Sequence, residues 1–181
     1  MRIQPTPEWK VVEESLFSHS SELQVFNGKI AGYDYGEYGG KISFIPDSGT
    51  EYKLINENFK GFYSSGGRVF VLTGLSNMFT DKGHIYEVIH SDDKWRAVPA
   101  IDLESCPESH LTVDGILYVA TNKALIVVET GAVTNTIPID ESYVGLYPNS
   151  MVWADSKLYI GVNGGMISVG LEDRKITLYS L

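Results

Sequence analysis

Short runs of apolar and strand-forming residues recur along the chain, and pairs of turn-forming residues separate them. Four such pairs are each followed at once by a mainly apolar run: Asn27-Gly28, Gly66-Gly67, Asp114-Gly115 and Asp155-Ser156. Their second residues stand at positions 28, 67, 115 and 156, so the intervals are 39, 48 and 41 residues. Asn-Gly and Asp-Gly favour two-residue hairpins, because a type I′ turn needs a positive φ at both central residues. The pattern predicts four similar β units.

Each unit contains enough apolar runs for four short strands. The third unit is the clearest, with strands predicted over residues 110–113, 116–121, 124–130 and 134–139. The strands predicted for the other units cover residues 23–26, 29–33, 41–46 and 52–55 in the first, 61–63, 68–73, 84–89 and 95–98 in the second, and 150–153, 157–162, 166–171 and 175–181 in the fourth. A long loop is expected between residues 73 and 84.

Hydrophobicity changes regularly within a unit. Residues 116–119 and 125–128 are apolar without alternation, which is typical of strands buried on both faces. The fourth strands instead carry polar residues such as Thr134 and Thr136, as expected where a sheet edge meets solvent. Four-stranded units with a period near 40 residues predict an all-β, β-propeller-like fold. We expect four blades of about four antiparallel strands, closed or partly open.

Two stretches of the sequence resemble a group of bacterial β-propeller repeat proteins of largely uncharacterised type. They are residues 35–40, Tyr-Gly-Glu-Tyr-Gly-Gly, and residues 145–152, Gly-Leu-Tyr-Pro-Asn-Ser-Met-Val, which lead into residues 157–161. The resemblance covers roughly residues 22–181 and implies the fold but no catalytic residue. The Trp-Asp dipeptide of tryptophan–aspartate repeats is absent from the sequence.

The N-terminal part lies outside the four-fold pattern. Trp9, Val12 and Leu16 recur at near-helical spacing, yet residues 9–12 are equally compatible with a strand. We favour the strand because everything that follows is β. The chain is thus divided into an N-terminal segment, residues 1–21, that packs on the propeller as a strand or short helix, and a propeller domain, residues 22–181.

Composition narrows the possible partners and the compartment. The 181 residues carry a formal net charge of −9, so the chain lacks the excess of Lys and Arg that binds nucleic acid or anionic membranes. Its N-terminus lacks the apolar core of a signal peptide, and no apolar run is long enough to span a bilayer. Cys106 is the single cysteine, which excludes an intrachain disulfide and favours a reducing compartment. We expect a cytoplasmic protein with no nucleic-acid or membrane partner.

Two loops carry residues that the fold does not require. The first combines Tyr35, Glu37 and Tyr38 with three glycines, a composition that offers large contact area at low entropic cost. The same loop could be a tight turn whose tyrosines cover the blade and whose Glu37 accepts bonds from backbone amides. The second loop places Met78 and Phe79 at its tip, where they could anchor a partner or fold over the central channel.

No strong catalytic pattern is present. Asp34 and Glu37 are the best carboxylate pair, but glycoside hydrolysis needs two carboxylates about 5–10 Å apart across a substrate. Neighbours within one loop do not supply that arrangement. Three acidic residues near Cys106 disfavour its thiolate and hence a nucleophilic role.

Cofactor and metal sites are equally without support. The sequence has no phosphate-binding loop, dinucleotide fingerprint or nucleophilic serine motif, so no cofactor is expected. No metal is expected either, since metal-ligand spacing is lacking around the four histidines, which are His19, His84, His90 and His110.

One face of the predicted propeller is the more negative. It holds the loops that join second to third strands and those that join one unit to the next. Nine acidic residues stand there against three lysines, a formal −6: Asp34, Glu37, Glu57, Asp81, Asp102, Glu104, Glu108, Asp140 and Glu141 against Lys60, Lys82 and Lys123. This charge favours a basic partner.

These features predict a non-enzymatic module that binds a protein partner. The loop face that would bind carries Tyr35, Glu37, Tyr38, Met78, Phe79, Asp81, Glu104 and Tyr143. A specific version is a cytoplasmic immunity protein that neutralises a basic bacterial toxin by occlusion, with association accelerated by charge.

Two alternatives remain open. One is a small carbohydrate-active hydrolase or lyase at the central channel, using Asp34 and Glu37. The other is a structural propeller that oligomerises through an unpaired strand at residues 9–12. The chain itself is expected to be a monomer or a weak homo-oligomer.

Overall fold

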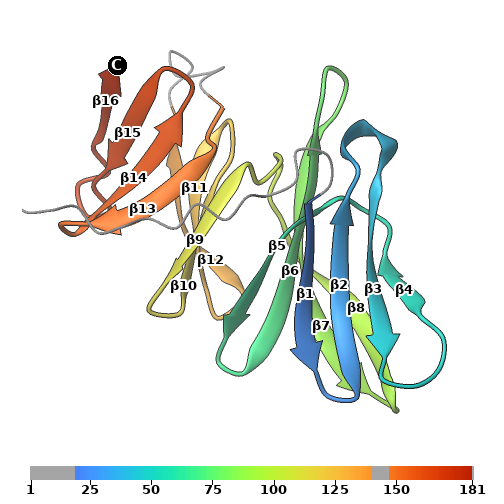
Figure 1. The fold of residues 1–181 in the computed structure, drawn as a ribbon. Helices are drawn as coiled ribbons and strands as arrows, with labels where there is room; N and C mark the ends of the chain where they lie inside the picture. Colours follow the sequence, from blue (N-terminus) through green and yellow to red (C-terminus); the bar gives the residue numbers. More distant parts are fainter. Residues whose placement is uncertain (1–18, 140–146, 181) are drawn as a thin grey trace, which may run out of the picture.

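The computed structural model describes residues 19–139 and 147–180, which form sixteen β-strands and one short 3₁₀ helix (Figure 1). The strands make four antiparallel sheets of four, and in each sheet they lie side by side in chain order. Each of the sixteen strands predicted for the four units has its counterpart. The expected all-β fold of four four-stranded blades is therefore confirmed.

The sheets follow one another along the chain. The first comprises β1 (His19–Val25), β2 (Gly28–Asp34), β3 (Gly40–Pro46) and β4 (Tyr52–Ile55), with the 3₁₀ helix η1 (Gly36–Tyr38) between β2 and β3. The second comprises β5 (Phe59–Ser65), β6 (Arg68–Ser76), β7 (Asp81–Ser91) and β8 (Lys94–Asp102). The third comprises β9 (Ser109–Val113), β10 (Ile116–Ala120), β11 (Ala124–Glu129) and β12 (Ala132–Pro138). The fourth comprises β13 (Ser150–Ala154), β14 (Lys157–Val162), β15 (Gly165–Val169) and β16 (Ile176–Ser180).

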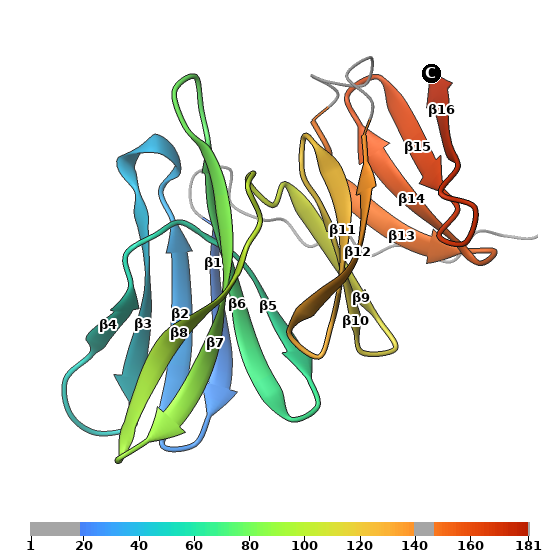
Figure 2. The same cartoon turned by 180° about the vertical axis from the view of Figure 1, so that it is seen from behind.

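The four sheets stack face to face in an open arc. Their first strands meet along its inner side, where β1 contacts β5, β5 contacts β9 and β9 contacts β13. On the outer side β4 contacts β8, and β8 contacts β12. The first and fourth sheets lie at opposite ends of the row, so the ring is not closed (Figures 1 and 2).

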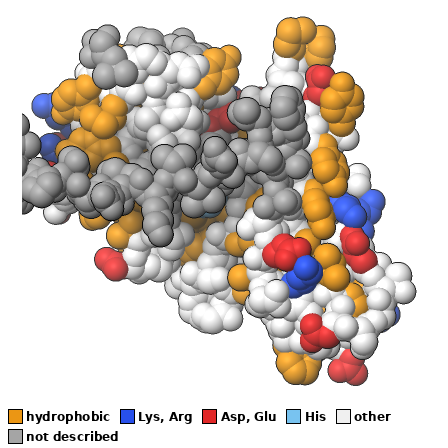
Figure 3. Space-filling model, viewed as in Figure 1, with side chains coloured by type: hydrophobic (Ala, Val, Ile, Leu, Met, Phe, Trp, Pro, Cys, Tyr) orange, Lys and Arg blue, Asp and Glu red, His pale blue; other side chains and the backbone are white. Residues whose placement is uncertain are grey.

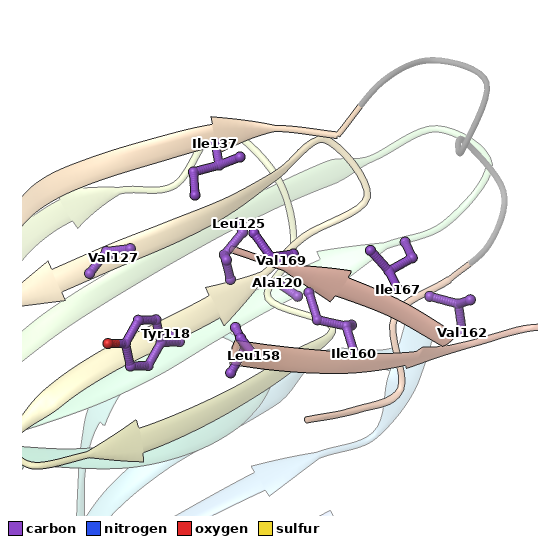
Figure 4. Packing of buried hydrophobic residues seen from close by; sticks show 10 residues of the cluster. All are labelled: Tyr118, Ala120, Leu125, Val127, Ile137, Leu158, Ile160, Val162, Ile167 and Val169. Atoms are coloured by element: carbon purple, nitrogen blue, oxygen red, sulfur yellow. The ribbon is translucent and has the colours of Figure 1, made fainter. Parts of the chain in front are cut away.

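The core lies between the sheets, as three separate clusters. In β10, Leu117 and Val119 pack against the second sheet, whereas Tyr118 and Ala120 pack against the fourth. Figure 4 shows the cluster between the third and fourth sheets, where side chains of β10, β11 and β12 meet those of β14 and β15. The uninterrupted apolar runs of the third unit are thus explained, because both faces of these strands are buried.

The first hairpin differs from the prediction by one residue. Val25 pairs with Gly28, so the turn is Phe26-Asn27 and not Asn27-Gly28. Gly28 is needed inside β2, because a Cβ there would lie 2.3 Å from the Ile45 carbonyl oxygen and 2.8 Å from the Phe44 ring. The second turn residues then stand at positions 27, 67, 115 and 156, and the first interval becomes 40 residues.

The prediction of a long loop in the second unit is wrong. β6 and β7 continue past it as a hairpin that ends in the tip residues 77–80 (Figure 1). Gly74 and Gly83 are paired in this hairpin, and the segment from Ser105 to Pro107 crosses directly over them. A Cβ on Gly83 would lie 2.3 Å from the Ser105 carbonyl oxygen, so these glycines permit a close crossing and do not end the strands.

The predicted N-terminal segment is described only at its end. β1 begins at His19, and residues 1–18, including the strand expected at residues 9–12, lie outside the described residues.

The packing between the third and fourth sheets predicts the effect of a core truncation. Leu158 is fully buried in their shared cluster, so Leu158→Ala should lower the free energy of unfolding by about 2–5 kcal/mol. Equilibrium urea unfolding measures this change. The neighbouring Lys157 is exposed, and Lys157→Ala should change stability by no more than about 0.5 kcal/mol. Equal losses in the two variants would contradict the packing.

Candidate functional site

Two hairpins of neighbouring sheets present large hydrophobic side chains to solvent at the same end of the molecule. On the β2–β3 loop Tyr38 is 89% exposed and Tyr35 44%. On the β6–β7 tip Met78 is 88% exposed and Phe79 91%. Figure 3 shows hydrophobic side chains at the ends of both hairpins. The structure thus brings four of the predicted binding residues to one end of the first two sheets.

The β2–β3 loop is held in a defined shape. Asp34 Oδ1 accepts a hydrogen bond from the Gly36 backbone N–H at 2.7 Å, and the Tyr35 N–H donates to the Gly39 carbonyl at 2.9 Å. Asn58 of the second sheet donates from Nδ2 to the Gly36 carbonyl at 2.6 Å. Gly36 and Gly39 have φ of 61° and 91°, which favours glycine. Asp34, and not Glu37, supplies the contact with a backbone amide.

The β6–β7 tip is also ordered by its own hydrogen bonds. Asn77 Oδ1 accepts from the backbone N–H groups of Phe79 at 3.0 Å and Thr80 at 2.8 Å. The Asn77 N–H in turn donates to the Thr80 carbonyl at 2.8 Å. This Asx-type turn fixes the backbone and leaves the side chains of Met78 and Phe79 directed away from the sheet.

Asp81 is occupied within the fold. Its carboxylate accepts hydrogen bonds from the Ser105 hydroxyl at 2.8 and 2.9 Å and from the Cys106 backbone N–H at 2.8 Å. Lys123 Nζ lies 3.3 Å from Asp81 Oδ2. Burial raises the pKa of Asp81, but the hydrogen bonds from Cys106, Ser105 and Lys123 outweigh it and lower that pKa overall. Asp81 therefore ties the 105–107 segment to the β6–β7 hairpin.

Glu104 lies on the same segment and is exposed. Its backbone has a φ of 58°, and its N–H donates to Asp102 Oδ1 at 2.9 Å. Its carbonyl accepts a hydrogen bond from Lys123 Nζ at 3.1 Å. The remaining predicted contact residue, Tyr143, lies outside the described residues.

The proposed acid–base pair is not arranged for catalysis. Both carboxylate oxygens of Asp34 are engaged, one by the Gly36 N–H and the other by Lys60 Nζ at 2.9 Å. Glu37 projects from η1 as an exposed side chain. Asp34 thus supports the loop, and its ion pair with Lys60 is mostly shielded from solvent.

Several carboxylates of this face are engaged in pairs within the fold. Asp34 pairs with Lys60 and Asp81 with Lys123, and Glu57 lies within hydrogen-bond distance of His84. Asp140 and Glu141 lie outside the described residues. Among the counted carboxylates that the structure describes, Glu37, Asp102 and Glu104 are exposed.

Sequence reasoning missed a polar cluster between the first and second sheets. Glu57 Oε2 accepts from the Thr73 hydroxyl at 2.6 Å and lies 2.9 Å from His84 Nδ1. Glu57 Oε1 accepts from the Tyr86 hydroxyl at 3.2 Å. Burial raises the pKa of Glu57, but the hydrogen bonds from Thr73, His84 and Tyr86 prevail, so the pKa lies below its ordinary value. The Glu57 carboxylate thereby fixes the β4–β5 connection to β6 and β7.

Cys106 is unsuited to nucleophilic chemistry, as its sequence context predicted. The thiol is fully buried, and burial is the main cause that raises its pKa to about 12, with Glu108, Asp81 and Asp34 adding to the effect. Burial also lowers the pKa of His110, whose ring packs against Gly61, and so favours the neutral imidazole.

In residues 19–139 and 147–180 no group of three or more His, Cys, Asp or Glu side chains could hold a metal ion. In the same ranges no helix has the length and apolar character needed to cross a membrane.

The Glu57 cluster predicts a pH-dependent contribution to stability. The folded pKa of Glu57 lies below the unfolded value near 4.5, so its carboxylate stabilises the fold above pH 4.5. That stabilisation is lost as the pH falls through the folded pKa. Glu57→Gln should cost about 1–3 kcal/mol at pH 7, and the difference from wild type should narrow below about pH 4.5.

Urea unfolding from pH 7 down to about pH 3.5 measures this dependence. Glu37→Gln is the matched control, because Glu37 is exposed on η1, and it should keep wild-type stability at pH 7. A constant difference between Glu57→Gln and wild type at every pH would contradict the role of the ionised carboxylate.

Comparisons with known proteins identify the fold. No family model matches the sequence, and no curated protein matches it. Among solved structures the chain is similar to virginiamycin B lyase from Staphylococcus aureus, with 15% sequence identity and a TM-score of 0.50. The match covers 84% of this chain and 52% of the lyase chain, so this chain spans about half the length of that protein. The likeness shows a β-propeller fold, and the narrower resemblance to bacterial propeller repeat proteins stays a prediction.

Proposed function

We propose that this protein is a non-enzymatic module that docks a protein partner with the tips of the β2–β3 and β6–β7 hairpins. The observation that carries the proposal is the exposure of Tyr35, Tyr38, Met78 and Phe79 on two loops at one end of neighbouring sheets. Three of these side chains are almost fully exposed, although removing an apolar side chain from water is favourable. Protein interfaces commonly use such aromatic and Met anchors.

The hydrogen bonds of the two tips support this role. Asp34 and Asn58 fix one loop, and Asn77 fixes the other, so little backbone entropy remains to be lost on binding. Burial of one large apolar side chain in a partner pocket contributes about 1.5–3 kcal/mol. Four anchors on two ordered tips therefore suffice for a specific interface, provided that the partner offers matching pockets.

Charge defines the partner more narrowly. Glu37 lies between the two tyrosines of its loop and is exposed, and the whole chain carries a formal net charge of −9. A basic protein is therefore the partner that this surface favours, with charge accelerating the encounter. In its most specific form the proposal is a cytoplasmic immunity protein that blocks a basic bacterial toxin by occlusion.

The chain offers a direct test through its hairpin tips. Purified wild-type protein and the double variant Met78→Ser, Phe79→Ser should be immobilised and exposed to lysate of the native host. We expect a partner that wild type retains and the double variant loses, because about 3–6 kcal/mol of apolar burial is removed. Capture is quantified by mass spectrometry.

Phe26→Ser is the matched control, because Phe26 is 72% exposed at the turn between β1 and β2, at the opposite end of the sheet. It should retain the partner. A partner lost equally by both variants, or by neither, would overturn docking through the tips. A partner that is lost only by the double variant but is acidic would leave the docking site standing and reject the toxin form.

The enzymatic alternative is a carbohydrate-active hydrolase or lyase, which the sequence placed at a central channel and assigned to Asp34 and Glu37. The similar solved structure is a lyase, but the 15% identity carries the fold alone. We expect wild-type protein to release no new chain ends from a panel of plant and bacterial polysaccharides in a reducing-sugar assay. Activity that disappears in Glu37→Gln would reverse this conclusion. Asp34→Asn tests the other carboxylate in the same assay. Because this variant also loses the ion pair with Lys60, circular dichroism must first confirm that it folds.

A further inference from the structure

Two Asn-Gly pairs occur in the chain, Asn27-Gly28 and Asn163-Gly164, and both lie at hairpin turns. The side-chain amide carbon of an Asn can be attacked by the backbone nitrogen of the next residue, because the two atoms are spaced to close a small ring. Gly permits this attack most readily, since it has no side chain to obstruct the approach. The two pairs are thus chemically alike, and the fold decides how they differ.

The backbone nitrogen beside Asn27 belongs to the sheet. Asn27 is the second residue of its turn, so the following Gly28 begins β2 and pairs with Val25 across the turn and with Pro46 of β3. A residue that closes a two-residue hairpin donates its backbone N–H to the carbonyl of its partner. The Gly28 nitrogen is therefore engaged and held away from the Asn27 amide.

Contacts with other segments restrain Asn27 further. Its backbone carbonyl accepts a hydrogen bond from the Asp47 N–H at 3.0 Å, and its Oδ1 lies 3.4 Å from Trp95 Nε1 of the second sheet. The space around Gly28 is also filled, since a Cβ there would lie 2.3 Å from the Ile45 carbonyl oxygen. Ring closure at Asn27 requires that this part of the first sheet opens.

The pair in the fourth sheet is placed one position earlier in its turn. Val162 pairs with Gly165, so Asn163 and Gly164 are both turn residues and the Gly164 N–H lies outside the strand ladder. Asn163 is exposed, and a Cβ on Gly164 would meet no heavy atom within 4 Å. The Gly164 nitrogen and the Asn163 amide can therefore approach each other without any strand pair being broken.

We propose that Asn163 is a site of spontaneous deamidation in the folded protein and that Asn27 is protected. A base in solution removes the Gly164 N–H proton, and the nitrogen forms a bond to Asn163 Cγ. The bond from Cγ to the amide nitrogen breaks, and ammonia leaves. Water then opens the resulting succinimide at either of its two carbonyl carbons. The products are aspartate, with the original backbone, and isoaspartate, whose backbone runs through the former side chain.

The isoaspartate product changes the hairpin between β14 and β15. It adds one carbon to the backbone of a two-residue turn, and such a turn fixes the register of the strands that it joins. Val162 on one side of the turn and Ile167 on the other belong to the core cluster shared by the third and fourth sheets (Figure 4). Isoaspartate at position 163 therefore loosens the packing of the fourth sheet, whereas aspartate adds only a charge on an exposed turn.

Peptide mapping by mass spectrometry tests the selectivity. Wild-type protein is incubated at physiological temperature in mildly alkaline buffer, and loss of the amide is followed at both Asn residues. Asn163 should react at least about tenfold faster than Asn27, a ratio that corresponds to an opening cost of about 1.4 kcal/mol or more at the first hairpin. Chromatography separates the aspartate and isoaspartate peptides of position 163.

The same protein unfolded in guanidinium chloride is the matched control. Both Asn-Gly pairs should then lose their amides at similar rates, because neither is held by a sheet. Equal rates in the folded protein, or an intact amide at Asn163, would overturn the proposal. A preference for Asn163 that persists in guanidinium chloride would also overturn it, since the fold would then not be its cause.

Two variants separate the effect of the backbone from that of charge. Asn163→Asp should unfold at the wild-type denaturant concentration, and the isoaspartate fraction of aged protein at a lower one. Asn163→Gln should keep its stability through the same incubation, because its longer side chain closes a ring far more slowly. Equal losses in Asn163→Asp and the isoaspartate fraction would contradict the role of the turn. No partner is needed for these measurements, so they stand apart from the docking proposal.

Discussion

Face-to-face stacking of the sheets is the constraint on which the structure depends. A four-stranded sheet of five-residue strands cannot bury enough apolar surface alone, so each sheet needs a neighbour. The second and third strands of the inner sheets therefore carry apolar residues at successive positions, since alternate side chains enter different clusters. Leu117 and Tyr118 illustrate this, being neighbours in sequence that belong to separate cores. This stacking produces the open arc, sets which strands lie on its inner and outer sides, and brings the β2–β3 and β6–β7 hairpins to the same end of the molecule.

Ionised side chains near the loop ends connect neighbouring sheets. Glu57 links the β4–β5 connection to β6 and β7, and Lys60 of β5 pairs with Asp34 of β2. Asp81 binds the segment of residues 105–107 that follows β8. These carboxylates form hydrogen bonds and ion pairs within the fold, so they are not free to contact a partner. The exposed aromatic and Met side chains of the two hairpin tips thus become the feature that distinguishes this end, more than its formal charge.

Much of the fold could be predicted because its signals are local. Asp114-Gly115 fixes a turn by its own backbone preference, and the apolar run after it shows burial on two sides. Gly28 misled the register because its reason is tertiary: the Phe44 ring and the Ile45 carbonyl approach too closely for a Cβ. Gly74 and Gly83 have the same kind of tertiary reason, since the segment that crosses them lies 22 residues beyond Gly83 (105−83) and 33 beyond Gly74 (107−74).

The candidate site was predictable only in part. Tyr35, Tyr38, Met78 and Phe79 could be found because their types are unusual for loops and turns. The roles of Asp34 and Asp81 could not be found, because a carboxylate in a loop has the same sequence signature whether it faces solvent or a lysine. Glu57 was counted as a loop charge, since its contacts with Thr73, His84 and Tyr86 exist only after two sheets have packed.

The separation of the core into three clusters has a consequence for how the molecule folds and opens. Each cluster joins two sheets, so a sheet at either end rests on one cluster, whereas the second and third sheets each rest on two. Stability is then transmitted from neighbour to neighbour, as in a linear chain of coupled units. We therefore expect the end sheets to open first and most often, and the amide protons of the middle two sheets to be protected longest against exchange.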